Sequence, residues 1–226
     1  MPSDKTTAIR GIFISFEGGD GVGKSTQIKN VAEALRQQQC TVLETREPGG
    51  CEGAEVIRDL LVNGPADRWT SLSEALMMYA ARAEHLDKTI LPALENGSVV
   101  LSDRFADSSM AYQGYAGDVG KSVVETLHGI VVGDNDPDLT IVLYADPKEG
   151  LARADERQSG EHRFESKGVT YQQAVTDAFK SIALENDKRC VLIDATDDIE
   201  TVTRNILREI NQRFVDRLKK LQKKES

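Results

Sequence analysis

A glycine-rich turn between an apolar strand and a helix constrains this chain more than any other feature. Residues 12–25, IFISFEGGDGVGKS, begin with large apolar side chains and end with Lys24 and Ser25 at the start of a helical stretch. The spacing of the glycines, lysine and serine fits the phosphate-loop pattern G-x-x-x-x-G-K-[ST]. Glycines let successive backbone N–H groups point into one concavity, and the positive end of the helix dipole lies behind it. The stretch therefore predicts a nucleoside triphosphate site rather than a turn that binds nothing.

Two side chains of this loop have the chemistry that triphosphate binding needs. Lys24 is long enough to reach the β- and γ-phosphates, and the Ser25 hydroxyl can coordinate Mg²⁺. We expect the whole loop to surround the phosphates. The predicted triphosphate-binding residues are therefore Gly18, Gly19, Asp20, Gly21, Val22, Gly23, Lys24, Ser25 and Thr26.

The rest of the chain alternates apolar strand-like segments with helical ones, which is typical of a parallel sheet covered by helices. Strands are expected at residues 12–16, 40–44, 98–104, 139–145 and 190–193. Helices are expected at residues 27–39, 52–62, 71–95 with a bend near Pro92, 105–115, 121–132, 147–156, 171–186 and from 198 onward. The sequence thus predicts an α/β protein with a three-layer phosphate-loop NTPase fold, a five-stranded parallel sheet and a short lid.

Neither an internal repeat nor a linker interrupts the 226 residues, so we expect a single domain, residues 1–226. Within it we expect a loose N-terminal arm at residues 1–9 and a lid region at residues 153–168. A polar tail is expected at residues 215–226, and its lysines favour a solvated surface over a nucleic-acid site.

The net charge and the cysteines limit which partners the protein is expected to bind and in which compartment it is expected to work. The formal net charge of −9 disfavours broad binding to nucleic acids or acidic membranes, but a few local cations suffice for a nucleotide. No apolar run approaches the ~20 residues of a membrane-spanning helix, and the N-terminus has no apolar signal core. Cys40, Cys51 and Cys190 are dispersed, so we expect free thiols and a cytoplasmic location.

The phosphate loop alone does not distinguish a kinase from a GTPase or another ATPase. The sequence contains no N-K-x-D segment for reading guanine. Five segments together resemble the thymidylate kinase family, in the same order over nearly the whole chain: EGGDGVGKST (17–26), REPGG (46–50), YAAR (79–82), DR (103–104) and AYQG (111–114). The resemblance implies a phosphotransferase that moves the γ-phosphoryl group of ATP to dTMP, giving dTDP and ADP for dTTP synthesis. It also implies Mg²⁺ and a homodimer, with small nucleotides as partners and neither nucleic acid nor membrane.

The resemblance assigns the phosphate and the sugar of the acceptor to charged residues. Arg46 and Arg104 match the arginines that hold the acceptor phosphate and aim one oxygen at the γ-phosphorus. Asp20 matches the acid that faces the 3′-hydroxyl of the acceptor sugar. Asp103 ends an apolar strand, where an acid contacts Mg²⁺ directly or through water, and Glu17 is a weaker candidate for the same shell. The alternatives are an exposed loop aspartate and surface ion pairs.

The resemblance also points to the residues that read the acceptor base. Arg82 matches the contact to the thymine O4 edge, and Ser108, Ser109 and Gln113 match positions that contact the base. The serines can alternatively serve only as helix caps. Met78 stands four residues before Arg82, where the family usually has a phenylalanine that stacks on thymine. Its side chain either covers the base less rigidly or fills the core, so base selectivity stays open.

The lid is expected to supply positive charge to the migrating phosphoryl group. Some thymidylate kinases carry an arginine inside the phosphate loop, at the position of Gly21. Its absence resembles the bacterial-type arrangement, in which lid arginines such as Arg153, Arg157 and Arg163 close over ATP. Arg153 and Arg157 are four residues apart and share one helix face, unless they only pair with neighbouring acids in solvent. The predicted catalytic residues are Lys24, Arg104, Arg153 and Arg157.

Two rival functions remain open from the sequence. One is a kinase whose acceptor is another monophosphate such as dUMP, because Met78 replaces an aromatic ring. The other is a nucleotide-binding regulatory protein without catalysis, which the presence of Lys24, Ser25 and Asp103 disfavours.

Overall fold

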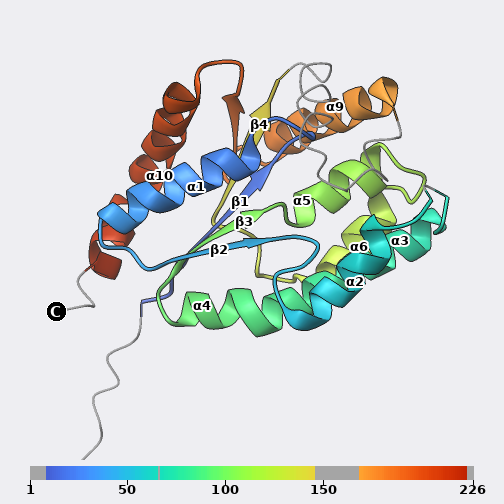
Figure 1. The fold of residues 1–226 in the computed structure, drawn as a ribbon, viewed down its shortest axis with the longest axis horizontal. Helices are drawn as coiled ribbons and strands as arrows, with labels where there is room; N and C mark the ends of the chain where they lie inside the picture. The colour runs from blue at the N-terminus through green and yellow to red at the C-terminus, as the bar shows by residue number, and fades with distance from the viewer. Residues whose placement is uncertain (1–8, 66, 146–167, 223–226) are drawn as a thin grey trace, which may run out of the picture.

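A five-stranded parallel sheet forms the middle layer of the protein, in a computed structural model that describes residues 9–65, 67–145 and 168–222. The strands are β1 (Ile12–Glu17), β2 (Val42–Arg46), β3 (Val99–Asp103), β4 (Leu139–Tyr144) and β5 (Cys190–Asp194). They lie in the order β2-β3-β1-β4-β5, with every pair parallel (Figure 1). β1 is buried at every position, as expected for a central strand with both faces covered. The predicted α/β fold with five parallel strands is confirmed.

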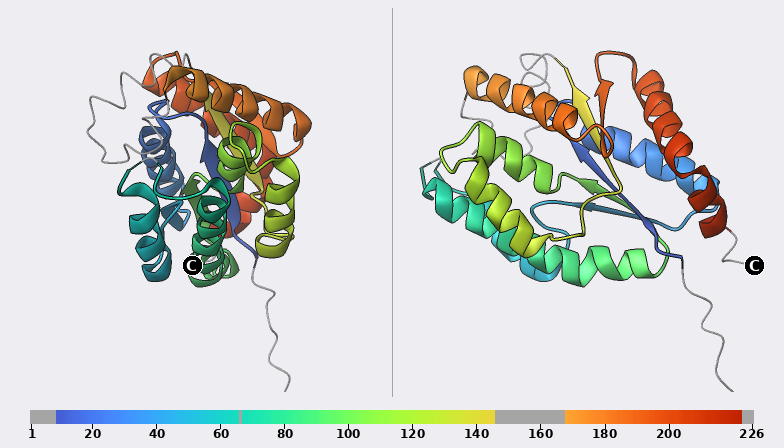
Figure 2. Two further views of the ribbon diagram at one scale, coloured as in Figure 1. Left: turned by 90° about the vertical axis from the view of Figure 1, so that its right-hand side faces the viewer. Right: turned by 180° about the vertical axis from the view of Figure 1, so that it is seen from behind.

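Helices cover both faces of this sheet. The described helices are α1 (Lys24–Gln37), α2 (Glu52–Val62), α3 (Ser71–His85), α4 (Leu91–Glu95), α5 (Ala106–Ser109), α6 (Lys121–Val131), α9 (Val169–Glu185) and α10 (Ile199–Gln222), with π-helical turns η1 (Leu86–Ile90) and η2 (Met110–Tyr115). α1 and α10 lie side by side on one face, and α3 to α6 and α9 lie on the other, with α2 packed on α3 (Figures 1 and 2).

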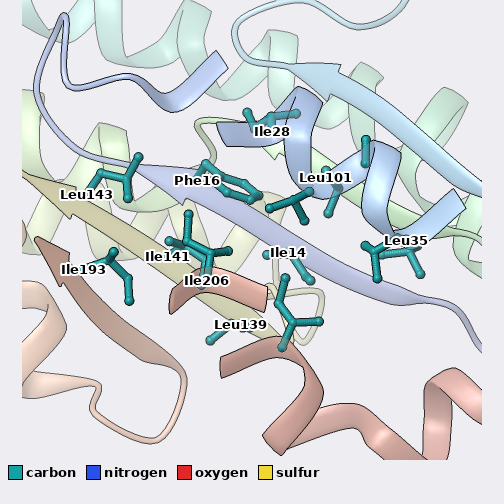
Figure 3. Packing of buried hydrophobic residues seen from close by; sticks show 14 of the residues in the cluster. Ile14, Phe16, Ile28, Leu35, Leu101, Leu139, Ile141, Leu143, Ile193 and Ile206 are labelled. Carbon is teal, nitrogen blue, oxygen red and sulfur yellow. The ribbon is translucent and has the colours of Figure 1, made fainter. Parts of the chain in front are cut away.

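The side chains of β1 alternate between two hydrophobic cores. Ile14 and Phe16 pack with residues of α1 and α10, among them Leu35 and Ile206 (Figure 3). Phe13 points to the opposite core, where its ring meets Phe105 edge to face at 4.9 Å. Because both of its faces are buried, β1 is held rigidly, and it fixes the position at which the phosphate loop begins.

β2 begins and ends two residues later than expected. Cys40 closes the turn that follows α1, because its N–H donates to the carbonyl of Leu35 at 3.0 Å. Gln39 makes the turn with φ of 64°, a left-handed conformation. The shift makes Arg46 the last residue of the strand, so its predicted place at the C-terminal edge of the sheet is confirmed.

The helix expected over residues 71–95 is interrupted earlier than at Pro92. The π-helical turn η1 occupies residues 86–90, and the N–H of Leu91 donates to the carbonyl of Leu86. Pro92 has no N–H to donate to the preceding turn, so the chain widens its hydrogen-bond spacing just before the proline and then resumes as α4.

The expectation of a polar tail from residue 215 is wrong as far as residue 222. α10 continues to Gln222, and Leu218 and Leu221 are buried in the core with α1. These leucines extend the helical stripe of Ile210, while the lysines between them are exposed. The start of the helix is as expected, because the Oδ1 atom of Asp198 accepts the N–H of Thr201 at 2.9 Å.

Several predicted features lie outside the described residues. These are the N-terminal arm up to residue 8, the helix expected at 147–156, and the lid up to residue 167 with Arg153, Arg157 and Arg163. Within the part of the chain that the structure describes, no helix is long and apolar enough to cross a membrane.

Candidate active site

Three strands deliver the predicted site residues to one edge of the sheet. β1, β2 and β3 end at Glu17, Arg46 and Asp103, and Asp103 is in register with Phe16 on one side and Arg46 on the other. The loops that follow these strands lead into α1, α2 and α5 (Figure 1). Because parallel strands end at the same edge, residues far apart in the sequence meet there.

The phosphate loop folds tightly against the neighbouring strand. Gly18 has φ of 131°, and a Cβ atom at this position would lie 2.2 Å from the carbonyl oxygen of Leu143. The buried Lys24 donates from Nζ to the carbonyls of Gly18, at 3.2 Å, and Gly19, at 2.8 Å. Burial lowers the pKa of Lys24 to about 8. The ammonium is thus held by its own loop, next to where phosphates would bind.

The two predicted metal ligands lie in contact. The Ser25 hydroxyl donates to the Oδ2 atom of Asp103 at 2.7 Å, although the residues are 78 positions apart. Among the described residues, no cluster of three or more His, Cys, Asp or Glu side chains could hold a metal ion. A hydroxyl beside a carboxylate fits Mg²⁺, which binds through one or two protein oxygens while keeping water and phosphate ligands.

Glu17 supports the loop after β3. It is fully buried; its Oε1 atom accepts the N–H of Phe105 at 2.7 Å, and its Oε2 atom accepts the hydroxyl of Ser108 at 2.6 Å. Burial, reinforced by the nearby Asp107, raises the pKa of Glu17 to about 8. Because both oxygens have protein partners, this contact does not favour Glu17 as a ligand of Mg²⁺.

Arg104 joins the phosphate loop to the neighbouring pocket. Its backbone has φ of 70°, a left-handed conformation that is uncommon for residues other than glycine. Nη1 donates to the carbonyl of Gly18 at 3.0 Å and to Ser108 at 3.1 Å. Nη2 donates to Asp20 at 2.5 Å and to the hydroxyl of Tyr112 at 3.2 Å. Burial by itself would raise the pKa of Asp20, but the positive charges of Arg104 and Lys24 and the hydrogen bonds to the carboxylate together hold it below its ordinary value.

A pocket beside Arg104 collects most of the predicted substrate-binding residues. It is lined by Asp20, Glu47, Pro48, Val62, Met78, Arg82, Arg104, Phe105, Ser108, Ser109, Tyr112 and Gln113. Arg46 is not among the lining residues and instead forms an exposed ion pair with Glu55 at 3.1 Å. The structure therefore brings together every predicted substrate-binding residue except Arg46.

Arg82 is locked in place at the back of this pocket. Nε donates to Glu47 at 2.8 Å, Nη1 to Ser109 at 3.1 Å and Nη2 to the carbonyl of Phe105 at 3.1 Å. Its guanidinium also lies over the rings of Tyr79 and Phe105. Burial lowers the pKa of Arg82, but Glu47 more than compensates and raises it above the ordinary value. The orientation of this arginine is thus set by the protein before any base binds.

Several residues that the sequence analysis did not predict make hydrogen bonds that hold the predicted residues or their loops. Glu47 also lies 3.0 Å from the Nδ1 atom of the buried His85, and Gln113 donates to the buried Glu74 at 3.0 Å. Arg58 donates to the carbonyl of Pro48 at 2.5 Å. Glu47 lies within the REPGG segment, but nothing in that segment indicates its partners, and Arg58, Glu74 and His85 lie in ordinary helical stretches.

A second cavity lies beside the phosphate loop and was also missed. It is lined by Gly21, Val22, Gly23, Thr26, Gln27, Ala195, Thr196, Asp197, Asp198, Ile199 and Val202. The cavity joins the predicted triphosphate-binding loop to the turn between β5 and α10.

Comparisons with known proteins point in one direction. The family model described as "Thymidylate kinase" matches residues 16–206. The chain is 48% identical to "Thymidylate kinase" of Caulobacter vibrioides, over 91% of this chain and 98% of that one, and 43% identical to "Thymidylate kinase" of Jannaschia sp. with the same coverage. It is also similar to the crystal structure of thymidylate kinase from Ehrlichia chaffeensis, with a TM-score of 0.71 and 31% identity over 89% of this chain and 99% of that chain.

Proposed function

The chain belongs to the thymidylate kinase family, and on this premise we propose that the pocket between Arg82 and Arg104 is its dTMP site. The enzyme transfers the γ-phosphoryl group of ATP to dTMP, giving dTDP and ADP for dTTP synthesis. ATP is bound on the phosphate loop, with its base toward the cavity at residues 195–198. One observation carries the proposal: Arg104 contacts the phosphate loop at Gly18 and also lines the acceptor pocket, so one guanidinium spans both substrates.

The transfer requires no protein nucleophile. An oxygen of the dTMP phosphate attacks the γ-phosphorus of ATP, the bond from phosphorus to the β–γ bridging oxygen breaks, and ADP leaves. Arg104 and Arg46 orient the attacking phosphate, and Asp20 accepts a hydrogen bond from the 3′-hydroxyl of the sugar. Lys24 exchanges the carbonyls of Gly18 and Gly19 for phosphate oxygens. The lid arginines Arg153 and Arg157 add positive charge to the migrating group.

Ser25 and Asp103 are proposed to hold Mg²⁺. Their hydrogen bond of 2.7 Å places two oxygen donors together at the end of β3, beside the loop. Held by these two residues, Mg²⁺ would supply positive charge to the β- and γ-phosphoryl oxygens. Chelation with EDTA should abolish phosphoryl transfer and added Mg²⁺ should restore it; full activity in EDTA would refute this part.

The acceptor is tested with a panel of monophosphates. ADP release is measured with ATP, Mg²⁺ and each of dTMP, dUMP, dCMP, AMP, GMP, CMP and UMP, with Lys24→Ala as the control for contaminating kinases. We expect a sharp preference for dTMP, with Met78 covering the base from the wall of the pocket. A preference for dUMP would mean that Met78 does not replace the phenylalanine ring that stacks on thymine. The acceptor would then differ, while the phosphoryl transfer would be the same.

We also propose that the enzyme is a cytoplasmic homodimer. α2, α3 and α6 are neighbours and expose large apolar side chains, namely Val56, Leu60, Leu72, Leu76, Val123 and Ile130. Light scattering should give the mass of two chains, and Ile130→Glu should give the mass of one. Leu184→Glu, at an equally exposed leucine of α9, is the control and should leave the dimer intact.

A further inference from the structure

A buried carboxylate holds one end of the amide that lines the base pocket. Nε2 of Gln113, in η2, donates to Oε1 of Glu74, in α3, at 3.0 Å. Gln113 is 3% exposed and Glu74 is 5% exposed. Gln113 lines the pocket, whereas Glu74 does not and so stands behind it. The sequence separation of 39 residues makes this a tertiary contact.

The chemistry of the pair fixes which end of the amide faces the base. The NH₂ group of Gln113 donates to a carboxylate oxygen of Glu74, and the reverse orientation would place two acceptor oxygens together. The side-chain hydrogen bond of Gln113 uses Nε2 and leaves Oε1 without a protein partner among the described residues. None of these residues has a fully buried side-chain nitrogen or oxygen that lacks a partner, so Oε1 is not fully buried. Oε1 of Gln113 is therefore reached from the pocket and offers an acceptor to a ligand.

Arg82, which lines the same pocket, offers the opposite chemistry. Its guanidinium has only donors, and buried Glu47 fixes it from behind as Glu74 fixes Gln113. A thymine or uracil base presents an acceptor, O4, next to a donor, the N3–H. Cytosine presents the reverse, with its N4 amino group as the donor and N3 as an acceptor. A donor from Arg82 and an acceptor from Gln113 in one pocket therefore match the first pattern and oppose the second.

We propose that Glu74 is a specificity-determining residue, which fixes the Gln113 amide so that its carbonyl accepts the N3–H of thymine and the site rejects cytosine nucleotides. The inference rests on the proposed dTMP site. Glu74 does not touch the substrate, and it acts by preventing the amide from turning over. Without it, the NH₂ group of Gln113 can face the pocket and donate to N3 of cytosine.

The test replaces the carboxylate by an amide of the same shape. Glu74→Gln both donates and accepts, so it permits either orientation of Gln113. We expect the ratio of kcat/KM for dTMP to that for dCMP to fall at least ~10-fold, mainly because dCMP improves, since a wrong partner no longer leaves a buried polar group unpaired. Glu84→Gln, the same change at an exposed position of α3, is the matched control and should leave the ratio unchanged.

A double variant separates this role from a merely structural one. Gln113→Leu removes the amide and should lower the ratio on its own, and adding Glu74→Gln to it should change the ratio no further. An equal loss with both acceptors in a folded Glu74→Gln enzyme would overturn the proposal. So would an unchanged ratio in Gln113→Leu, even if Glu74→Gln did not fold. If the wild-type enzyme preferred a monophosphate other than dTMP, the proposed function would fail instead.

Discussion

The pocket proposed for dTMP and the phosphate loop share one edge of the sheet but are held by different kinds of contact. In the pocket, Arg82 and Gln113 are each fixed by a buried carboxylate, Glu47 and Glu74. In the loop, Lys24 is held by carbonyls of its own backbone, which phosphate oxygens can replace. A site that must distinguish similar bases needs fixed donors and acceptors, whereas a site for a phosphate chain needs positive charge that can move to it.

This contrast predicts whether a substitution lowers the stability of the protein or its catalytic rate. Removing a fixed group from the pocket takes one hydrogen-bond partner away from a buried carboxylate, so stability should suffer along with binding. Removing the cation of the loop takes away a group whose burial is itself unfavourable, so catalysis should suffer while stability does not. The following substitutions test the two sides in turn.

The largest expected loss of stability follows Arg82→Met. The change leaves Glu47 buried without its guanidinium partner, and breaking a buried ion pair costs about 3–5 kcal/mol. Urea unfolding should show this decrease in the free energy of unfolding, together with loss of dTMP binding. Arg36→Met, which breaks an ion pair between half-exposed side chains, is the control and should change stability by less than about 1 kcal/mol. A loss as small as that of the control would mean that Arg82 is not fixed as described.

Lys24→Ala should have the opposite profile. We expect turnover to fall at least ~100-fold, equivalent to about 2.7 kcal/mol, because charge stabilisation is lost in a site that excludes water. The free energy of unfolding should stay constant or rise, since burial disfavours the ammonium and lowers its pKa to about 8. ADP-release kinetics and urea unfolding are compared with Lys29→Ala, an exposed lysine on the same helix. Near-normal turnover would remove Lys24 from the catalytic assignment.

The sequence predicts the loop side better than the pocket side, and the reason is physical. The phosphate loop is a local pattern that includes Ser25, and Asp103 ends an apolar strand, so both residues could be named from the sequence before their contact was seen. Glu47 and Glu74 reach Arg82 and Gln113 only through tertiary packing, across 35 and 39 residues. Glu47 belongs to the REPGG segment, which does not indicate its buried partner, and Glu74 lies in a helical stretch that carries no sign that it will be buried.

The same limit explains the error at the C-terminus. Lysines dominate the composition after residue 215, and this hid the helical spacing of Leu218 and Leu221. The fold itself could be predicted because apolar strands alternate with helices along the chain, a pattern that survives such local errors. Met78 lines the pocket, as expected, but its effect on base selectivity stays a prediction.

Glu17 lies between the two regions and should make stability depend on pH. Its pKa is raised from the ordinary 4.5 to about 8, mainly by burial, so the folded state holds a proton that the unfolded state releases between these values. The stabilisation is complete below about pH 4.5 and is lost as the pH rises through about 8. Relative to Glu17→Gln, the wild-type free energy of unfolding should therefore decrease from pH 5 to 8.5. Parallel curves for the two proteins would contradict the raised pKa.

The smallest expected change in stability is at Arg46, which separates a substrate contact from a surface ion pair. Arg46 and Arg36 are similarly exposed, at 55% and 49%, and each pairs with a glutamate, at 3.1 and 2.7 Å. Both alanine variants should therefore change the free energy of unfolding by less than about 1 kcal/mol. If Arg46 leaves Glu55 to hold the dTMP phosphate, only Arg46→Ala should raise the KM for dTMP, by roughly 10-fold or more, as a charged hydrogen bond is lost. Identical kinetics in the two variants would mean that Arg46 forms only a surface ion pair and that Arg104 binds the acceptor phosphate without it.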